Sequence, residues 1–162
     1  MKQAVLILLL TAMLCGCGAR ETVETVDDTL ETGVPVVRRE VQVELPGEAA
    51  IPTMESEGSR YYICDGYEIS LETFPSGDVQ KAIETISGFD PSRLTVVKTR
   101  QQEADRYDFV WTAEGEQGGR LGRASILDDG NYLYTLSVLR DQENQETSQV
   151  VWRTVFESFK LT

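Results

Sequence analysis

The 162 residues of this chain contain no histidine. Its reactive side chains include 27 carboxylates, three cysteines and six tyrosines. A Ser-His-Asp triad, a Cys-His pair and a histidine-ligated zinc ion are therefore excluded. The 27 Asp and Glu residues outnumber the 15 Lys and Arg residues, and the formal net charge is −12. A chain this acidic has no electrostatic means of holding a phosphate backbone, so we expect no nucleic-acid partner.

The carboxylates offer two kinds of site. A pair of acids can serve as general acid and base when their surroundings separate their pKa values, but among so many acids some pair lies close by chance. The run Asp128-Asp129-Gly130-Asn131 offers oxygen ligands that calcium accepts, although the same residues are typical of a hairpin turn. We interpret the run as a turn, and we predict no catalytic residue, no metal and no cofactor.

Four glycines between Gly115 and Gly122 could form a phosphate-binding loop. Such a loop requires a helix after it, so that the helix N-terminus faces the phosphate. Here the pattern of a strand follows, and the neighbouring Glu114 and Glu116 would repel an anion. We therefore interpret these glycines as a flexible hairpin.

Three tyrosines, Tyr61, Tyr62 and Tyr67, flank the pair Asp65-Gly66, which a type I′ hairpin prefers. Exposed tyrosines there could form a binding surface. Alternation along a strand must nevertheless send at least one of them into the core. Cys64 lies in the same apolar run, and we interpret it as a small buried apolar residue rather than a reactive thiol.

The first residues have the features of an export signal. Lys2 is the only charge before Arg20, and residues 4 to 14 are all apolar except Thr11. Such a run would span about 16 Å as a helix, roughly half of the hydrocarbon core of a bilayer. The run is therefore typical of a secretory signal peptide rather than of a membrane-spanning helix.

The apolar run ends in Leu14-Cys15-Gly16-Cys17, which resembles the lipobox of bacterial lipoproteins. The resemblance implies that residues 1–16 are a signal peptide removed by cleavage after Gly16. It also implies that Cys17 carries a diacylglyceryl group through a thioether. Two acyl chains give durable residence in a membrane, so the expected location is the extracytoplasmic face of the cell membrane.

Two other outcomes of processing remain open. Lipidation of Cys15 would place the bulky Leu14 at the cleavage position, which signal peptidases disfavour. Cleavage after Ala19 would leave an ordinary secreted protein without a lipid.

Residues 17–37 are predicted to be the lipidated cysteine and a flexible acidic tether, and residues 38–162 a single domain. The tether holds five acids against the single base Arg20, which favours a self-repelling linker with a reach of about 25 Å. It is long enough to lift the domain clear of the lipid headgroups.

The periodicity of residues 38–162 predicts the element order β-β-β-α-β-β-β-β-α. A first helix is expected to begin at a Ser76 cap and to end at Gly88, with Ala82 and Ile83 on its buried face. A strand over 132–139 has apolar residues on both faces, which indicates a central strand covered on both sides. The other expected strands span 38–45, 60–64, 67–73, 94–100, 106–113 and 120–127, a loop spans 48–59, and a second helix spans 146–159.

The hairpin connections predict an α+β fold, in which an antiparallel sheet of six or seven strands carries two packed helices. The side chains of Tyr107, Phe109 and Trp111 are expected in its core. The closing helix, which contains Phe156-Glu157-Ser158-Phe159, is expected to present a wide apolar stripe to the sheet that includes Val151 and Val155.

This order of elements and the closing Phe156-Glu157-Ser158-Phe159 helix resemble the PsbP-like fold. That family includes many bacterial lipoproteins and consists mostly of non-catalytic binding or assembly modules. Our first hypothesis is therefore a non-enzymatic, membrane-anchored extracytoplasmic lipoprotein that binds another envelope protein or a small ligand. The alternatives are a carrier of small apolar ligands with a pocket between sheet and helix, and a carboxylate-based envelope hydrolase.

Overall fold

The computed structural model describes residues 36–115, 118–141 and 145–162, and for residues 145–151 it describes the backbone alone. The predicted signal peptide, the cleavage after Gly16 and the lipid on Cys17 lie outside the described residues, as do residues 17–35 of the predicted tether. Residues Val36–Thr162 form one compact unit.

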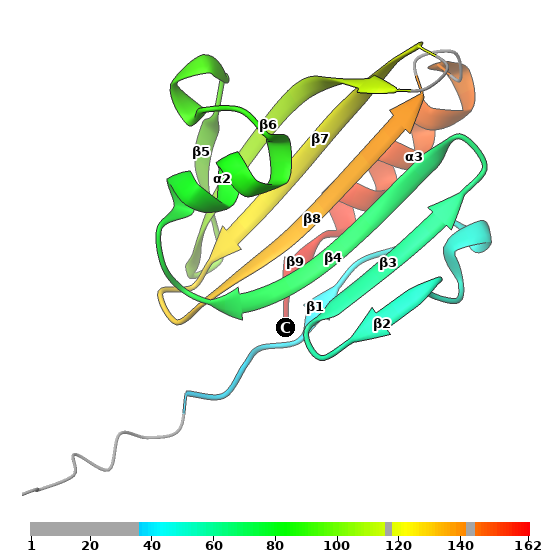
Figure 1. The fold of residues 1–162 in the computed structure, drawn as a ribbon. Helices are drawn as coiled ribbons and strands as arrows, with labels where there is room; N and C mark the ends of the chain where they lie inside the picture. Colours follow the sequence, from blue (N-terminus) through cyan, green and yellow to red (C-terminus); the bar gives the residue numbers. More distant parts are fainter. Residues whose placement is uncertain (1–35, 116–117, 142–144) are drawn as a thin grey trace, which may run out of the picture. The chain divides into compact units, whose positions relative to one another are not determined.

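Short loops connect the strands and helices of the described chain, and the colours of Figure 1 follow them from the N-terminus to the C-terminus. The elements are β1 (Val41–Gln42), η1 (Gly47–Ala49), β2 (Met54–Ser56), β3 (Ser59–Cys64), β4 (Tyr67–Pro75), α2 (Val79–Ser87), η2 (Pro91–Arg93), β5 (Val97–Gln101), β6 (Ala104–Gly115), β7 (Gly118–Asp128), β8 (Tyr132–Asp141), α3 (Gln145–Ser158) and β9 (Lys160–Leu161).

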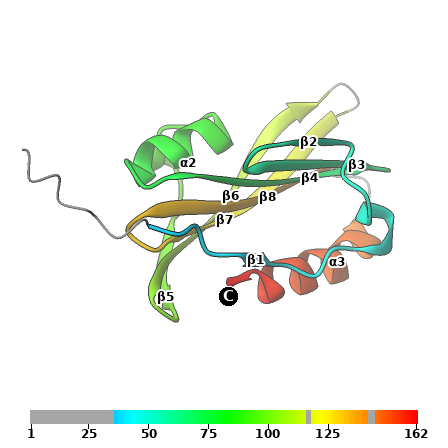
Figure 2. The same cartoon turned by 90° about the horizontal axis from the view of Figure 1, so that it is seen from below.

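Seven of these strands form one antiparallel sheet in the order β2-β3-β4-β8-β7-β6-β5. Helix α2 lies on one face of the sheet and helix α3 on the other (Figure 2). Strands β1 and β9 form a separate two-stranded sheet on the α3 side. The predicted α+β class, with an antiparallel sheet and two packed helices, is confirmed.

Strand β8 is buried on both faces because each face contributes to a different apolar core. Tyr134, Leu136 and Val138 belong to the core under α3, together with Trp152, Val155 and Phe156 of the helix. Leu133 belongs to the core under α2, together with Ala82, Ile83, Phe109 and Trp111. The predicted central position of the strand and the predicted core placement of Phe109 and Trp111 are therefore confirmed, while Tyr107 is half-buried against that core. The side chain of Val151 lies outside the described residues.

The predicted turns at Asp65-Gly66 and at Asp128–Asn131 are present and their residues fit the geometry, whereas the tip of the predicted glycine hairpin, residues 116–117, lies outside the described residues. Gly66 follows Asp65 with a φ of 77°, between the paired residues Cys64 and Tyr67. In the turn after β7, one carboxylate oxygen of Asp129 accepts hydrogen bonds from the backbone N–H groups of Asn131 and Tyr132, at 2.9 and 2.7 Å. Asp129 therefore works as a turn residue here, as the pattern predicts.

The start of α2 differs from the prediction. Asp78 is the N-cap, because its carboxylate accepts from the N–H groups of Gln80 and Lys81. The hydroxyl of Ser76 instead donates to Asp128 across the sheet, at 3.0 Å. Either residue can cap a helix, and the tertiary contact of Ser76 decides between them.

The two ends of the domain also differ from the prediction. The strand expected over 38–45 is reduced to β1, whose partner is the unpredicted β9. The loop expected over 48–59 contains η1 and the edge strand β2, and the strand expected from residue 94 begins at Val97 after η2. Segments of two or three residues are too short to show a period, so their pairing depends on the rest of the fold.

The side chain of Trp111 on β6 packs closely on Gly122 of β7. Gly122 lies opposite Trp111 in the register, and a Cβ atom added to it would lie 2.1 Å from Cε2 of the indole. We expect Gly122→Ala to lower the free energy of unfolding by about 1–3 kcal/mol, because the indole must leave its place. Urea unfolding of the full-length protein measures this change.

Gly77→Ala is the matched control, since a Cβ atom there meets nothing within 4 Å. We expect it to leave the free energy of unfolding unchanged or to raise it by up to about 1 kcal/mol. Equal effects of the two substitutions would contradict the close packing of Trp111 on Gly122.

Candidate functional site

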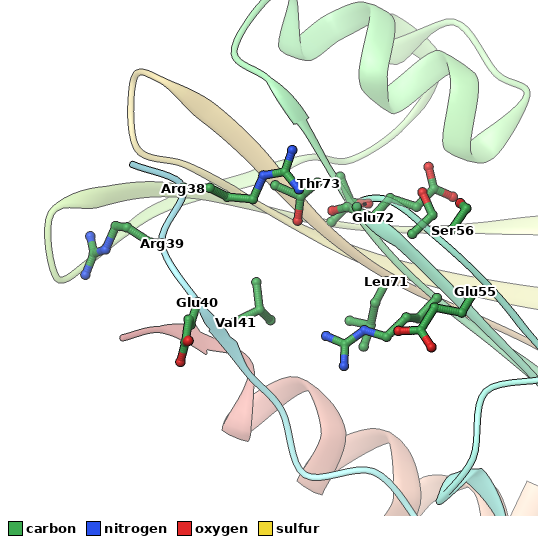
Figure 3. Close-up of a pocket in the computed structure, with 13 residues that line it drawn as sticks. Arg38, Arg39, Glu40, Val41, Glu55, Ser56, Leu71, Glu72 and Thr73 are labelled. Atoms are coloured by element: carbon green, nitrogen blue, oxygen red, sulfur yellow. Dashed lines mark hydrogen bonds between the residues drawn. The ribbon is translucent and has the colours of Figure 1, made fainter. Parts of the chain in front are cut away.

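A groove of about 410 Å³ opens on the α3 side of the sheet. It is lined by residues 38–41, by residues of the β2–β3 hairpin and by residues 71–73 of β4 (Figure 3). We call residues 36–46 the strap, because this segment runs along the α3 side and forms one wall of the groove.

The strap is held by hydrogen bonds to residues far away in the chain. The N–H of Arg39 donates to the hydroxyl of Tyr134 at 2.9 Å, and the N–H of Glu44 donates to Ser158 at 2.8 Å. The N–H of Thr162 donates to the carbonyl of Glu40 at 3.0 Å. Val41, Val43 and Leu45 pack against the core under α3, which confirms their predicted common side.

Tyr134 is the anchor of the strap. Its side chain is fully buried, and its hydroxyl accepts from Arg39 while donating to Asp129 at 3.0 Å. Burial raises the pKa of Tyr134 above the ordinary value near 10. The hydroxyl is therefore neutral at physiological pH and makes both hydrogen bonds at once.

Arg38 is placed in the groove by an aromatic ring and a glycine. Its guanidinium carbon lies 5.5 Å from the centre of the Tyr132 ring, within the range of a cation–π contact. Gly58, at the β2–β3 turn, has a φ of 78°, and a Cβ atom there would lie 2.8 Å from the carbonyl oxygen of Thr73 and 3.3 Å from Arg38 Nη1. Figure 3 shows Arg38 directed towards Thr73, with Arg39 and Glu40 directed away from the groove.

Arg60 is a second cation on the same wall of the sheet. It lies opposite Leu71 in the β3–β4 register and opposite Glu55 in the β2–β3 register. Both arginines are exposed, and within the described residues neither forms an ion pair with a carboxylate.

Glu72 also lines the groove, but alternation along β4 places its carboxylate on the face of the sheet opposite to that of Leu71. It accepts from the hydroxyls of Tyr61 and Ser70, at 2.6 and 2.8 Å. The Glu72 hydrogen bond raises the pKa of Tyr61. The Glu72 carboxylate therefore has a structural role, as the acceptor for the Tyr61 and Ser70 hydroxyls.

The residue patterns of the sequence predict no binding residue in this groove. One feature of the sequence could have indicated Arg38, namely a change from negative to positive charge. Arg38-Arg39 is the first basic pair after a stretch that contains five acids and one base. Arg60 carries no such signal, and only the pairing of β3 with β4 brings it near the strap.

The residues around the β3–β4 turn lie outside the groove. Tyr62 is buried in the core, which confirms that at least one of the three tyrosines is a core residue. The hydroxyl of Tyr67 donates to Glu48 at 3.2 Å. Cys64 is a free thiol that is half-buried against the core under α3, so it is less enclosed than predicted.

A partly buried polar network joins the sheet to the end of α3. Arg106 donates to both carboxylate oxygens of Asp108, at 2.8 and 3.1 Å, and to the carbonyls of Phe156 and Phe159, at 3.0 and 3.3 Å. Ser125 donates to the same Asp108 carboxylate. A cation at the carbonyl end of a helix is stabilising, so this cluster has a structural role.

A second, more open hollow lies between the end of α2 and β6, and Glu114 is the single ionisable residue among its described lining residues. Within the described ranges, no group of three His, Cys, Asp or Glu side chains could hold a metal ion. In the same part of the chain, no helix is both long and apolar enough to cross a membrane.

No family model matches this chain, and no curated protein matches its sequence. A solved structure of a protein from Bacteroides thetaiotaomicron VPI-5482 shares the fold, with a TM-score of 0.51 and 11% identity over 75% of this chain. This chain spans 45% of that protein, less than half of its length. The resemblance to the PsbP-like family remains a prediction.

A second solved structure is that of LpqN from Mycobacterium tuberculosis, described as involved in cell envelope biogenesis. It aligns with a TM-score of 0.49 and 9% identity, covering 77% of this chain and 84% of that one. At 11% identity the Bacteroides comparison bears on the fold and not on the function.

The anchor of the strap can be tested with Tyr134→Phe. The substitution leaves the N–H of Arg39 without its acceptor, so we expect the free energy of unfolding to fall by about 1–2 kcal/mol. The Arg39 amide should also exchange with solvent faster. Tyr132→Phe is the control, because among the described residues the Tyr132 hydroxyl makes no hydrogen bond, and we expect a change below about 0.5 kcal/mol.

The pH dependence of the free energy of unfolding should also differ between wild type and Tyr134→Phe. Because the folded-state pKa of Tyr134 is raised, its contribution to stability is complete below the unfolded value near 10 and is lost as the pH rises through the folded-state pKa. Wild-type stability should therefore decline above pH 10, and more steeply than that of Tyr134→Phe. Parallel profiles of the two proteins would contradict a buried, neutral Tyr134.

Proposed function

We propose that this chain is a membrane-anchored extracytoplasmic lipoprotein whose residues 38–162 act as a non-catalytic binding domain, with the groove as its ligand site. The observation that carries the proposal is the groove itself, which is lined by two arginines, Arg38 beside the Tyr132 ring and the exposed Arg60, without ion-pair partners among the described residues. Its volume lies in the range of about 300–1,000 Å³ that is usual for small-molecule sites.

The anchor in this proposal is the predicted lipid on Cys17. The strap begins at Val36, within the last two residues of the predicted tether, so the wall of the groove and the predicted tether are adjacent in the sequence. The net charge of −12 would be repelled by anionic headgroups, so the acyl chains must supply the membrane attachment.

The geometry favours binding over carboxylate catalysis. Of the three acids that line the groove, Glu72 is hydrogen-bonded to Tyr61 and Ser70, and Glu40 points away. The apolar side chains of Val41 and Leu71 line the same groove, which favours a small ligand with an apolar portion. In this form of the carrier hypothesis, the site lies between sheet and strap rather than between sheet and helix.

The anchor can be tested by replacing each cysteine of the predicted lipobox. We expect Cys17→Ala to abolish lipidation and to remove the protein from the membrane fraction, because no thiol remains at the processing position. Cys15→Ala should keep both properties and serves as the matched control. Mass spectrometry of the purified chains and cell fractionation measure the two outcomes, and an acyl-free wild-type chain would contradict the proposal.

The binding role can be tested on the full-length protein extracted from its own membranes in a mild detergent. We expect native mass spectrometry to find a species heavier than the lipidated chain, and denaturing mass spectrometry to find the lipidated chain alone. The difference is the mass of a non-covalent ligand. Equal masses under both conditions would count against a carrier.

A further inference from the structure

We propose that the groove recognises an anionic group of its ligand, a phosphate or a carboxylate, through Arg38, with Arg60 as a second cation. This inference rests on the proposed binding function and names the chemical class of the ligand. It follows from the placement of the arginines, from the carboxylates around them and from the apolar surface between them.

Arg38 is held in position before any ligand arrives. The hydrogen bond from Arg39 to Tyr134 fixes the adjacent backbone, and the Tyr132 ring lies 5.5 Å from the guanidinium. Gly58 leaves the space beside Nη1 open, because it has no Cβ. A guanidinium ordered in this way loses little side-chain entropy when it binds, and its planar fork suits phosphate and carboxylate oxygens.

The charge of Arg38 is not neutralised by the acids that line the groove. Glu40 is directed away from it in Figure 3, and Glu72 is hydrogen-bonded to Tyr61 and Ser70. Glu55 faces Arg60 in the strand register rather than Arg38.

The surface between the two arginines is partly apolar. Leu71 lies opposite Arg60 and two residues before Thr73 on β4, and Val41 faces it from the strap. A ligand that places an anionic oxygen on Arg38 can therefore place an apolar portion over Val41 and Leu71. The same chemistry is offered by a soluble amphipathic anion and by the headgroup of an anionic lipid.

The experiment is a titration of full-length protein in a non-ionic detergent, at constant ionic strength. The soluble probes are inorganic phosphate and hexanoate, and the lipid probes are nanodiscs of phosphatidylglycerol or of phosphatidylcholine. We expect the wild-type protein to bind at least one anionic probe, and Arg38→Gln to weaken that binding at least tenfold. Arg60→Gln should weaken it less, and Arg38→Lys should give an intermediate loss.

Arg93→Gln is the matched control, because Arg93 also lies 5.5 Å from an aromatic ring, that of Phe89, and lines no part of the groove. It changes the net charge equally, and we expect the affinity to stay within twofold of wild type. An unchanged urea midpoint for each variant shows that the fold is retained.

The probes separate the two sources of the anion. Binding of phosphate or hexanoate supports a soluble ligand, whereas binding that requires phosphatidylglycerol supports a lipid headgroup. Failure of every anionic probe, or an equal loss in Arg93→Gln and Arg38→Gln, would overturn the inference. The masses of the lipidated chain and of its native complex test the proposed function separately, so a bound neutral molecule would leave that function standing while this inference fails.

Discussion

The hydrogen bond from the backbone of Arg39 to the hydroxyl of Tyr134 is the contact on which the groove depends. It joins residues 95 positions apart and fixes the strap against the centre of the sheet. The acceptor is rigid because Tyr134 is fully buried and also donates to Asp129, which itself is held by the turn before β8. Without this bond, the backbone beside Arg38 would lose its contact with the sheet, and the strap would be held further along by the pairing of β1 with β9, by the Glu44–Ser158 hydrogen bond and by the packing of Val41, Val43 and Leu45.

The anchor is firm because β8 is a central strand of the sheet. It pairs with β4 on one side and β7 on the other, and its two faces enter two separate cores. Arg106 then ties the end of α3 to the sheet by donating to the carbonyl of Phe156 in its last turn and to that of Phe159 just after it. The buried residues of the core hold the strap in place, and the strap forms one wall of the groove. The exposed site therefore depends on residues that do not line it.

The regular part of this architecture could be predicted from residue patterns. Alternation and turn residues indicate the long hairpins, and the apolar residues on both faces of 132–139 indicate the central strand. The predictions are wrong where a distant partner decides the local structure. Ser76 bonds to Asp128 and leaves the cap of α2 to Asp78, and the strand expected over 38–45 shortens to the two residues that meet β9.

The candidate site was hidden from sequence reasoning for the same reason. Arg38 and Arg60 are 22 positions apart and belong to no motif, and they share a groove because the strap returns to the sheet beside β3 and β4. The most direct measurement of its role is the 15N chemical shift of the arginine side chains during titration with hexanoate or phosphatidylglycerol nanodiscs. This account predicts that the Arg38 signal moves with saturation while the Arg93 signal stays in place. An unmoved Arg38 signal at concentrations where a ligand is bound would contradict it.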